Sequence, residues 1–346
     1  MITDSPTPSS SAAQTPRQRE IRRWLRQCLG GDQDDITTVS GDASFRRYYR
    51  HRRGTSSWIV MDAPPAQESC TEFVAIARHL RTLGLQAPEV YASDFERGLL
   101  LLSDLGDRQY LGELNEDSAD RLYGSALDVL ERLQTDQTLL TALPPYDEAL
   151  LREEMALFGE WFLGHHLGLD TEGWAHILTP AEDRLVANAL EQPTVMVHRD
   201  YHSRNLMILE DEAPGILDFQ DAVVGPITYD LVSLLRDCYI VWPPERVEAW
   251  LQAYRQRPCI AALIGEVDAA RWRRWFDLMG LQRHLKCAGI FARLYYRDGK
   301  PGYLKDIPLT VQYLIDASAA YPEFADLHRL LADRIAPALA KRASNS

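Results

Sequence analysis

One stretch near the middle of the chain restricts the possible folds more than any other. It begins with the β-branched run Thr194 to Val197, which predicts a strand. Two further apolar runs, Leu206 to Leu209 and Gly215 to Leu217, are separated by charged residues and a proline, which indicate a turn between paired strands. Asn205 precedes the first run and Asp218 follows the second, so antiparallel pairing brings both to the same open end of a hairpin.

The loop between the strand and the hairpin carries His198-Arg199-Asp200, followed five residues later by Asn205. This spacing fits H-R-D-x-x-x-x-N, in which the aspartate accepts the proton of an attacking hydroxyl and the asparagine holds magnesium. An ordinary hairpin with surface polar residues is the alternative, but asparagine occurs at only four positions in the chain. We therefore predict phosphoryl transfer from ATP with Mg²⁺, with Asp200 as the base and Asn205 and Asp218 as metal ligands.

The composition excludes several other classes of protein. The chain has 346 residues, 46% of them hydrophobic and 25% charged, which suits a globular protein with two domains or one bilobed domain. A net charge of −13 argues against nucleic-acid binding. No stretch is long enough to cross a membrane and the N-terminus does not resemble a secretory signal, so we expect a cytoplasmic protein. No obligate protein partner is evident, and the five cysteines contain no C-x-x-C pair, so we expect buried free thiols.

The N-terminal third predicts a small lobe rich in strands. Residues 1–16 are rich in Ser, Thr and Pro and predict a flexible tail, and residues 17–106 predict a nucleotide-binding lobe. A polar loop at 103–106 follows an apolar strand and predicts a hinge, where the main chain around Ser103 and Leu105 would bind adenine. The predicted helices are 21–29 and 73–83, and the predicted strands are 36–39, 45–50, 58–61, 90–92 and 98–102.

The predicted small lobe contains no lysine, because the first lysine of the chain is Lys286. Met61 stands on the third strand, where protein kinases carry the lysine that pairs with the α- and β-phosphates. Guanidinium groups bind phosphate oxygens bidentately, so arginines on the preceding strand are candidates, although a solvated strand face explains each of them equally well. The candidate phosphate-binding residues are Ser44 in the small-residue loop, Arg46, Arg47 and Arg50.

Residues 107–346 predict a second lobe that is mainly helical. Helical periodicity covers 118–134, 146–163, 269–296, 309–321 and 323–339. Asp230 is interpreted as a helix cap or a loop-bracing carboxylate. Six lysines and arginines between Arg283 and Lys305 suggest a site for an anionic ligand, and solvated charges on a helix face are the alternative. The candidate substrate-binding residues are Tyr201, Arg204, Arg283, Lys286 and Arg293.

Together, His198-Arg-Asp200 with Asn205, Leu217-Asp218-Phe-Gln and Tyr229-Asp230-Leu231 resemble the aminoglycoside phosphotransferase and choline kinase family. The resemblance spans most of the chain from Ile36 onward. It implies an α+β, bilobed protein-kinase-like fold with a small β-rich N-lobe and a large, mainly helical C-lobe. It also implies an enzyme that binds ATP and Mg²⁺ between its lobes and phosphorylates a small molecule.

Finer features resemble one branch of that family, the bacterial anomeric amino-sugar kinases of peptidoglycan recycling. They are Gly41-Asp-Ala-Ser-Phe-Arg-Arg-Tyr-Tyr49, Ile59-Val-Met-Asp-Ala-Pro-Pro65 and Asp218-Phe-Gln-Asp-Ala-Val-Val-Gly-Pro226. This resemblance implies phosphorylation of the C1 hydroxyl of N-acetylmuramate or N-acetylglucosamine, to give the α-1-phosphate. Other small-molecule kinases, for aminoglycosides, choline or amino alcohols, and a non-catalytic nucleotide-binding module remain alternatives.

Overall fold

The structure is a computed structural model, which describes residues 15–31, 36–39, 46–210 and 213–344. The chain divides into two compact units. Unit 1 comprises the chain up to Arg78 together with Pro88–Asp104, and unit 2 comprises His79–Ala87 and the chain from Leu105 onward. The boundary between Asp104 and Leu105 falls inside the predicted hinge. The short segment at 79–87 was predicted to lie in the N-terminal lobe, but it is tied to unit 2 because the N–H of Ile216 donates to the carbonyl of Gln86 at 2.8 Å.

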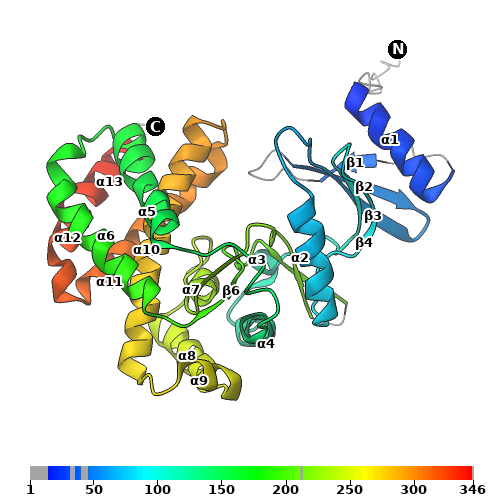
Figure 1. Cartoon of the computed structure of the whole chain (residues 1–346). Coiled ribbons are helices and arrows are strands. Elements are labelled where there is room, and N and C mark those ends of the chain that lie inside the picture. Colours follow the sequence, from blue (N-terminus) through cyan, green and yellow to red (C-terminus); the bar gives the residue numbers. More distant parts are fainter. Residues whose placement is uncertain (1–14, 32–35, 40–45, 211–212, 345–346) are drawn as a thin grey trace, which may run out of the picture. The chain divides into compact units, whose positions relative to one another are not determined.

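Unit 1 is an antiparallel sheet with a helix packed on one face. In the described part of the chain the sheet has five strands in the order β1-β2-β3-β5-β4 (Figure 1). Its elements are α1 (Pro16–Leu29), β1 (Ile36–Thr38), β2 (Arg47–Arg53), β3 (Ser56–Asp62), α2 (Thr71–Thr82), β4 (Val90–Asp94) and β5 (Leu99–Ser103), and the last part of α2 belongs to unit 2.

The helix α1 covers the sheet with its apolar stripe. Ile21, Trp24 and Leu25 recur at helical spacing and pack into one buried cluster with strand residues of the sheet, among them Tyr49 and Val60. Because side chains alternate along a strand, these strand residues share one face, and Arg50 and Met61 lie on the other. The alternation decides which arginines of β2 face α1.

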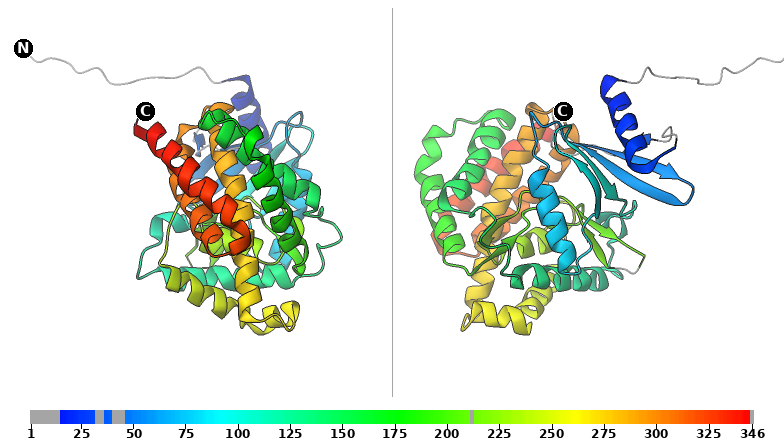
Figure 2. Two further views of the ribbon diagram at one scale, coloured as in Figure 1. Left: turned by 90° about the vertical axis from the view of Figure 1, so that its left-hand side faces the viewer. Right: turned by 45° about the vertical axis from the view of Figure 1, so that its right-hand side comes forward.

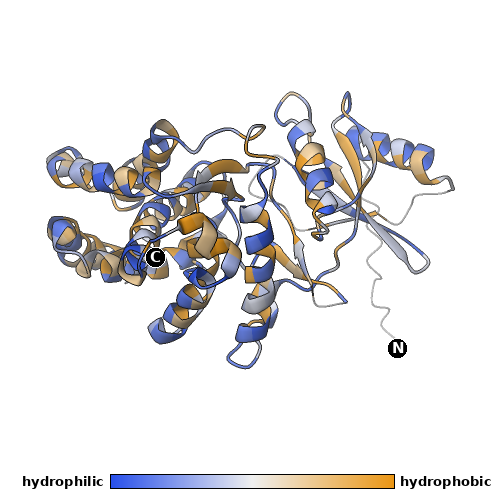
Figure 3. Cartoon of the chain, turned by 60° about the horizontal axis from the view of Figure 1, so that its bottom comes forward, coloured by the Kyte–Doolittle hydropathy of each residue, from blue (hydrophilic) through white to orange (hydrophobic). Residues whose placement is uncertain are grey.

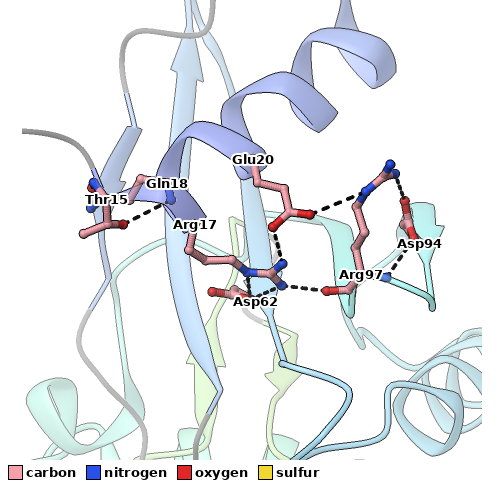
Figure 4. A network of polar contacts seen from close by, with 7 residues as sticks. All are labelled: Thr15, Arg17, Gln18, Glu20, Asp62, Asp94 and Arg97. Carbon is pink, nitrogen blue, oxygen red and sulfur yellow. Dashed lines mark hydrogen bonds and ion pairs between the residues drawn. The ribbon is translucent and has the colours of Figure 1, made fainter.

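The first turn of α1 is fixed by a polar network around a buried carboxylate (Figure 4). Thr15 and Gln18 form a capping box that begins the helix one residue later, at Pro16, inside the segment predicted as a tail. The Arg17 guanidinium donates to Asp62 at 2.6 and 3.0 Å and to the carbonyl of Arg97 at 2.6 Å. Asp62 is almost fully buried, so this ion pair compensates for a desolvated charge and holds α1 against the end of β3.

Unit 2 is mainly helical, with two short strand pairs. β6 pairs with β9 and β7 pairs with β8. Its elements are α3 (Tyr110–Glu113), α4 (Ala119–Thr135), α5 (Glu148–Leu157), η1 (Phe158–His166), η2 (Glu172–Trp174), α6 (Ala175–Leu190), β6 (Thr194–Val197), β7 (Leu206–Ile208), β8 (Pro214–Ile216), β9 (Val223–Pro226), α7 (Tyr229–Leu235), α8 (Pro244–Arg255), α9 (Pro258–Ile264), α10 (Ala269–Tyr296), η3 (Pro301–Asp306), α11 (Ile307–Ala319), η4 (Pro322–Phe324), α12 (Ala325–Leu330), η5 (Leu331–Ile335) and α13 (Ala336–Ser344).

The 28-residue helix α10 is the central element of unit 2, and its bounds are those predicted. It contacts α5, η1, α6, α7 and α11, so most of its circumference is buried (Figure 2). Gly289 allows the closest approach, because a Cβ there would lie 2.4 Å from the carbonyl carbon of Leu157. The helices around it turn their hydrophilic faces outward and their hydrophobic faces inward (Figure 3).

Some elements differ from the sequence-based expectation. The strand β9 and the helices α8 and α9 are not among the elements predicted from the sequence. Cys70, Cys238 and Cys287 are buried free thiols as expected, whereas Cys259 is exposed. None of the helices in the described ranges is both long enough and apolar enough to cross a membrane.

Candidate active site

The hairpin of β7 and β8 forms as predicted, with Leu206 opposite Ile216. Asn205 and Asp218 therefore flank its open end. The side-chain amide of Asn205 donates to the main-chain carbonyl of Asp200 at 3.0 Å and lies 3.4 Å from the Asp218 carboxylate. The three residues predicted to carry the chemistry thus converge, because the register of one short hairpin fixes the positions of two of them.

The carboxylate of Asp218 is oriented by its own backbone and by a neighbour. Its φ of 62° lies in the left-handed region, which aspartate adopts more readily than most side chains do. The amide of Gln220 donates to the other carboxylate oxygen of Asp218 at 2.9 Å. In the sequence Gln220 is part of the motif that carries the family resemblance, and its contact with Asp218 was not predicted.

An amide and a carboxylate side by side are suitable ligands for a hard divalent cation. Magnesium prefers oxygen ligands and is usually held by one or two carboxylates together with substrate phosphates. The amide oxygen of Asn205 can face a cation after rotation of the amide group, since its two ends have nearly the same shape. The described residues contain no cluster of three or more His, Cys, Asp or Glu side chains suited to a metal. The amide and carboxylate oxygens of Asn205 and Asp218 fit magnesium that is bound jointly with a phosphate ligand.

Asp230 holds the beginning of the loop that carries Asp200. Its carboxylate accepts main-chain N–H bonds from His198 at 2.6 Å and from Arg199 at 3.0 Å. Arg199 has a φ of 75°, so the chain turns sharply here without a glycine. Of the two readings given to Asp230, the loop-bracing one is confirmed, because the side chain of the N-cap residue Thr228 makes no capping bond and Asp230 lies inside α7.

Asp237 holds the other end of the same loop, and no pattern in the sequence pointed to it. One of its carboxylate oxygens accepts from the main-chain N–H of Ser203 at 3.0 Å and from its hydroxyl at 2.5 Å. The other oxygen accepts from the N–H of Tyr239 at 3.1 Å. Asp230 lies in the first turn of α7 and Asp237 lies two residues after its end, so one short buried helix positions both ends of the loop.

Positive charges surround Asp200. Burial alone would raise the pKa of its carboxyl, but the charges of Lys286, His202, Arg283 and Arg199 hold the pKa below its ordinary value. Lys286 donates to the buried Glu154 at 2.8 Å and to the Tyr229 hydroxyl at 2.9 Å. Arg199 forms an ion pair with the same Glu154. This carboxylate therefore neutralises two cations beside the loop, and it too was missed in the sequence.

The residues predicted to bind substrate have different surroundings. The Tyr201 ring is fully buried and its hydroxyl donates to the carbonyl of Ala126 in α4 at 2.8 Å, which favours a structural role. Arg283 is buried beside the thiols of Cys287 and Cys238, at 3.4 and 3.8 Å. Arg293 is half-buried on α10. Arg204 is half-buried next to Asn205.

The residues predicted to bind nucleotide are separated by the pleat of β2. Arg46 is buried and pairs with Glu68 at 2.7 Å, and Arg50 forms a bidentate pair with Asp104 at 2.6 and 2.9 Å. Arg47 lies opposite Asp62 on the face that carries α1 and is exposed. In the hinge, Ser103 exchanges hydrogen bonds with Glu89, while Leu105 packs against Gly215. Ser44 lies outside the described residues.

Comparison with known proteins gives one family. The model of the phosphotransferase enzyme family matches residues 35–274. A relative from Pseudomonas aeruginosa named N-acetylmuramate/N-acetylglucosamine kinase is 46% identical over 331 residues, which are 91% of this chain and 96% of the relative. A relative of the same name from Neisseria meningitidis is 38% identical and covers 92% of this chain and 96% of its own length.

Solved structures with low sequence identity share the fold. A choline kinase from Streptococcus pneumoniae superposes with a TM-score of 0.61 at 12% identity, over 88% of this chain and 99% of that structure. An ADP-bound aminoglycoside phosphotransferase gives a TM-score of 0.59 at 16% identity, over 86% and 98%. The α+β, bilobed protein-kinase-like fold expected from the sequence is therefore confirmed.

Proposed function

The chain belongs to the phosphotransferase enzyme family, and we propose that it phosphorylates the anomeric hydroxyl of N-acetylmuramate and N-acetylglucosamine at the expense of ATP. It is an enzyme of the kinase type, and the use of ATP follows from the family. The observation that carries the proposed substrate is the 46% identity over 91% of the chain to a kinase named for these two sugars. The α-1-phosphate would enter peptidoglycan recycling in the cytoplasm, where ATP is available.

Asp200 is the proposed base. Its carboxylate accepts the proton of the C1 hydroxyl as the oxygen attacks the γ-phosphorus of ATP, the bond from that phosphorus to the β,γ-bridging oxygen breaks, and ADP leaves. A hemiacetal hydroxyl is more acidic than an ordinary alcohol, so a carboxylate whose pKa is held low by Lys286 and its neighbours faces a smaller mismatch in proton affinity. Phosphoryl transfer requires little covalent chemistry from the protein, so positioning and neutralisation of charge supply most of the catalysis.

Asn205 and Asp218 are the proposed ligands of Mg²⁺, which supplies neutralisation of the negative charge on the phosphates when bound. Gln220 keeps one oxygen of Asp218 engaged at 2.9 Å and so limits the rotation of the carboxylate. The hairpin register holds the two ligands at a fixed separation. In this arrangement the chain's own residues set the place of the cation relative to Asp200.

The surroundings of the predicted nucleotide-binding residues favour some of them over others. Arg47 lies on the face of the sheet that carries α1, so Arg46, whose partner is Glu68, is proposed for the phosphates together with Ser44 in the preceding loop. The N–H of Ser103 is already bonded to Glu89. The main chain of Leu105 makes no hydrogen bond to another described residue and is the better candidate for adenine.

Assays of phosphate transfer to free sugars and to their methyl glycosides test the proposal. Free N-acetylmuramate and N-acetylglucosamine should be phosphorylated, and the methyl glycosides should be inert because their C1 oxygen carries no proton. Methyl glycosides that react as well as free sugars would refute the anomeric position. Transfer to an aminoglycoside, choline or an amino alcohol instead would establish another small-molecule kinase, and no transfer to any acceptor would favour a nucleotide-binding module.

A further inference from the structure

Arg204 lies between two tyrosine rings at the end of the loop that carries Asp200. Its guanidinium carbon is 4.1 Å from the ring centroid of Tyr239 and 5.5 Å from that of Tyr303 in η3. Phe291 of α10 connects the two rings, at centroid distances of 6.1 Å to Tyr239 and 5.8 Å to Tyr303. These cation–π contacts hold the guanidinium next to the two rings and use none of its N–H donors.

The guanidinium of Arg204 has no counter-ion among the described residues. Arg204 takes part in one hydrogen bond there, and it is the main-chain carbonyl that accepts it, from the amide of Gln109 at 3.0 Å. Asp306 is the acid that interacts with this guanidinium through space, but it forms no ion pair with it, and burial raises the pKa of Asp306. A half-buried guanidinium with five donors and no carboxylate partner is an arrangement suited to an anionic ligand.

Other cations considered for this role have different surroundings. Lys286 is neutralised by Glu154, and Arg297 by the adjacent Asp298 at 2.9 and 3.0 Å. Arg283 also lacks a carboxylate contact, but it is 3% exposed and covered by two thiols, so a ligand has little access to it. Arg204 and Arg293 are both half-buried and without an ion pair among the described residues, and of the two only Arg204 lies close to Asp200 in the chain, four residues away.

We propose that Arg204 is a specificity-determining residue that binds the lactyl carboxylate of N-acetylmuramate. The proposal rests on the proposed function, because it presumes that this sugar is an acceptor. N-acetylglucosamine has the same ring but no carboxylate, so Arg204 distinguishes an acidic acceptor from a neutral one. A guanidinium that is held by aromatic contacts and keeps its N–H donors free can bind a carboxylate with two parallel N–H bonds. It gains nothing comparable from a neutral sugar.

The test compares Arg204→Gln with the wild type on both sugars at saturating ATP. The variant loses the charge-assisted hydrogen bonds to the carboxylate, so kcat/KM for N-acetylmuramate should fall by roughly 10- to 100-fold, mainly through a higher KM. The value for N-acetylglucosamine should change by less than about threefold, because that sugar makes no such bond. Arg297→Gln is the matched control, since it removes an exposed arginine that already has an acidic partner, and it should leave the ratio of the two sugars unchanged.

Two further measurements separate this role from a structural one. With the wild type, the methyl ester of N-acetylmuramate should give a lower kcat/KM than the acid, because the ester removes the charge that Arg204 binds. For the same reason, the ester should give the same kcat/KM with the wild type and with Arg204→Gln. Asp306→Asn removes a negative charge that acts on the Arg204 site and should raise kcat/KM for N-acetylmuramate alone. The ester measurement on the wild type needs no variant, so it tests recognition of the carboxylate even if a variant folds poorly, and an ester used as well as the acid overturns the proposal.

Results that would rule out this role of Arg204 differ from those that would rule out the proposed sugar kinase activity. An equal loss of kcat/KM for both sugars in Arg204→Gln would show that the guanidinium supports the loop. The same loss with a raised KM for ATP would place the guanidinium at the nucleotide phosphates. Unchanged selectivity in that variant, or an ester that the wild type uses as well as the acid, would also refute it. A wild-type enzyme that phosphorylates neither sugar would refute the proposed function itself.

Discussion

The buried carboxylate of Asp230 accepts a hydrogen bond of 3.0 Å from the main-chain N–H of Arg199, a residue whose φ is 75°. A non-glycine residue in this region stores about 1–3 kcal/mol of strain. The contact spans 31 residues of sequence and joins the first turn of α7 to the loop that carries Asp200. Asp230 therefore compensates for the strain of the turn that places the proposed base.

Replacing Asp230 by Asn should destabilise the protein and lower kcat. The amide nitrogen of asparagine cannot accept a hydrogen bond. One of the two main-chain N–H groups that now donate to Asp230 is therefore left unpaired in the interior. Such a loss costs about 1–3 kcal/mol, which urea unfolding would measure. Unfolding and kcat both unchanged in Asp230→Asn would show that this bond does not hold the loop.

The same carboxylate predicts a dependence of stability on pH. Burial raises the pKa of Asp230 to about 7, despite the two N–H bonds that act in the opposite direction. The ordinary pKa of an aspartate in an unfolded chain is about 3.9, so between these values the folded state holds a proton that the unfolded state has lost. This contribution to stability is present below pH ~4 and is lost as the pH rises through about 7.

The slope of that loss is at most about 1.4 kcal/mol per pH unit for a single group. Asp230→Asn has no proton to lose, so the difference in free energy of unfolding between wild type and variant should be larger at pH ~5 than at pH ~7.5. A difference that stays constant across this range would contradict the raised pKa of Asp230.

Asp237 and Ser203 give a graded pair of variants at the other end of the loop. Ser203→Ala removes the hydroxyl but keeps the main-chain N–H bond to Asp237, so it should cost about 1 kcal/mol. Asp237→Ala removes the acceptor for Ser203 and for the N–H of Tyr239, so it should cost more and should also reduce kcat. Equal effects of the two variants on unfolding would show that Asp237 acts only through the serine hydroxyl.

Asp200→Asn tests the base directly. The amide keeps the size of the side chain but cannot accept a proton, so kcat should fall by about 10²-fold or more. ATP binding, measured calorimetrically on the same variant, should remain close to that of the wild type. Retention of full turnover would remove Asp200 from the role of base, and loss of ATP binding would assign it to the nucleotide site.

The Glu154 network predicts non-additive effects. Glu154→Gln leaves Lys286 and Arg199 without their shared carboxylate, whereas Lys286→Met leaves Glu154 still paired with Arg199. Breaking a buried ion pair from one side costs about 3–5 kcal/mol, so Glu154→Gln should be the more destabilising single variant. The loss in free energy of unfolding in the double variant should be smaller than the sum of the losses in the two single variants, which a double-mutant cycle in urea would measure. Simple additivity would show that the charges are not coupled.

The sequence by itself determined the local parts of this protein. The hairpin register follows from two apolar runs around a turn, and it alone places Asn205 and Asp218 together. The bounds of α10 follow from helical periodicity and from Asp268, whose side chain caps the helix by accepting from the N–H of Arg271 at 2.8 Å. These features depend on neighbours within a few residues, which a linear pattern records.

Only the tertiary structure decided which charges are neutralised. Lys286, a substrate-binding candidate from the sequence, pairs with Glu154 on a helix far away in the sequence. Arg204, another candidate, has aromatic neighbours and no counter-ion among the described residues. Asp230 and Asp237 become anchors only because α7 packs beside the loop. An ion pair requires two groups within about 4 Å, and for residues distant in sequence the packing of helices sets that distance.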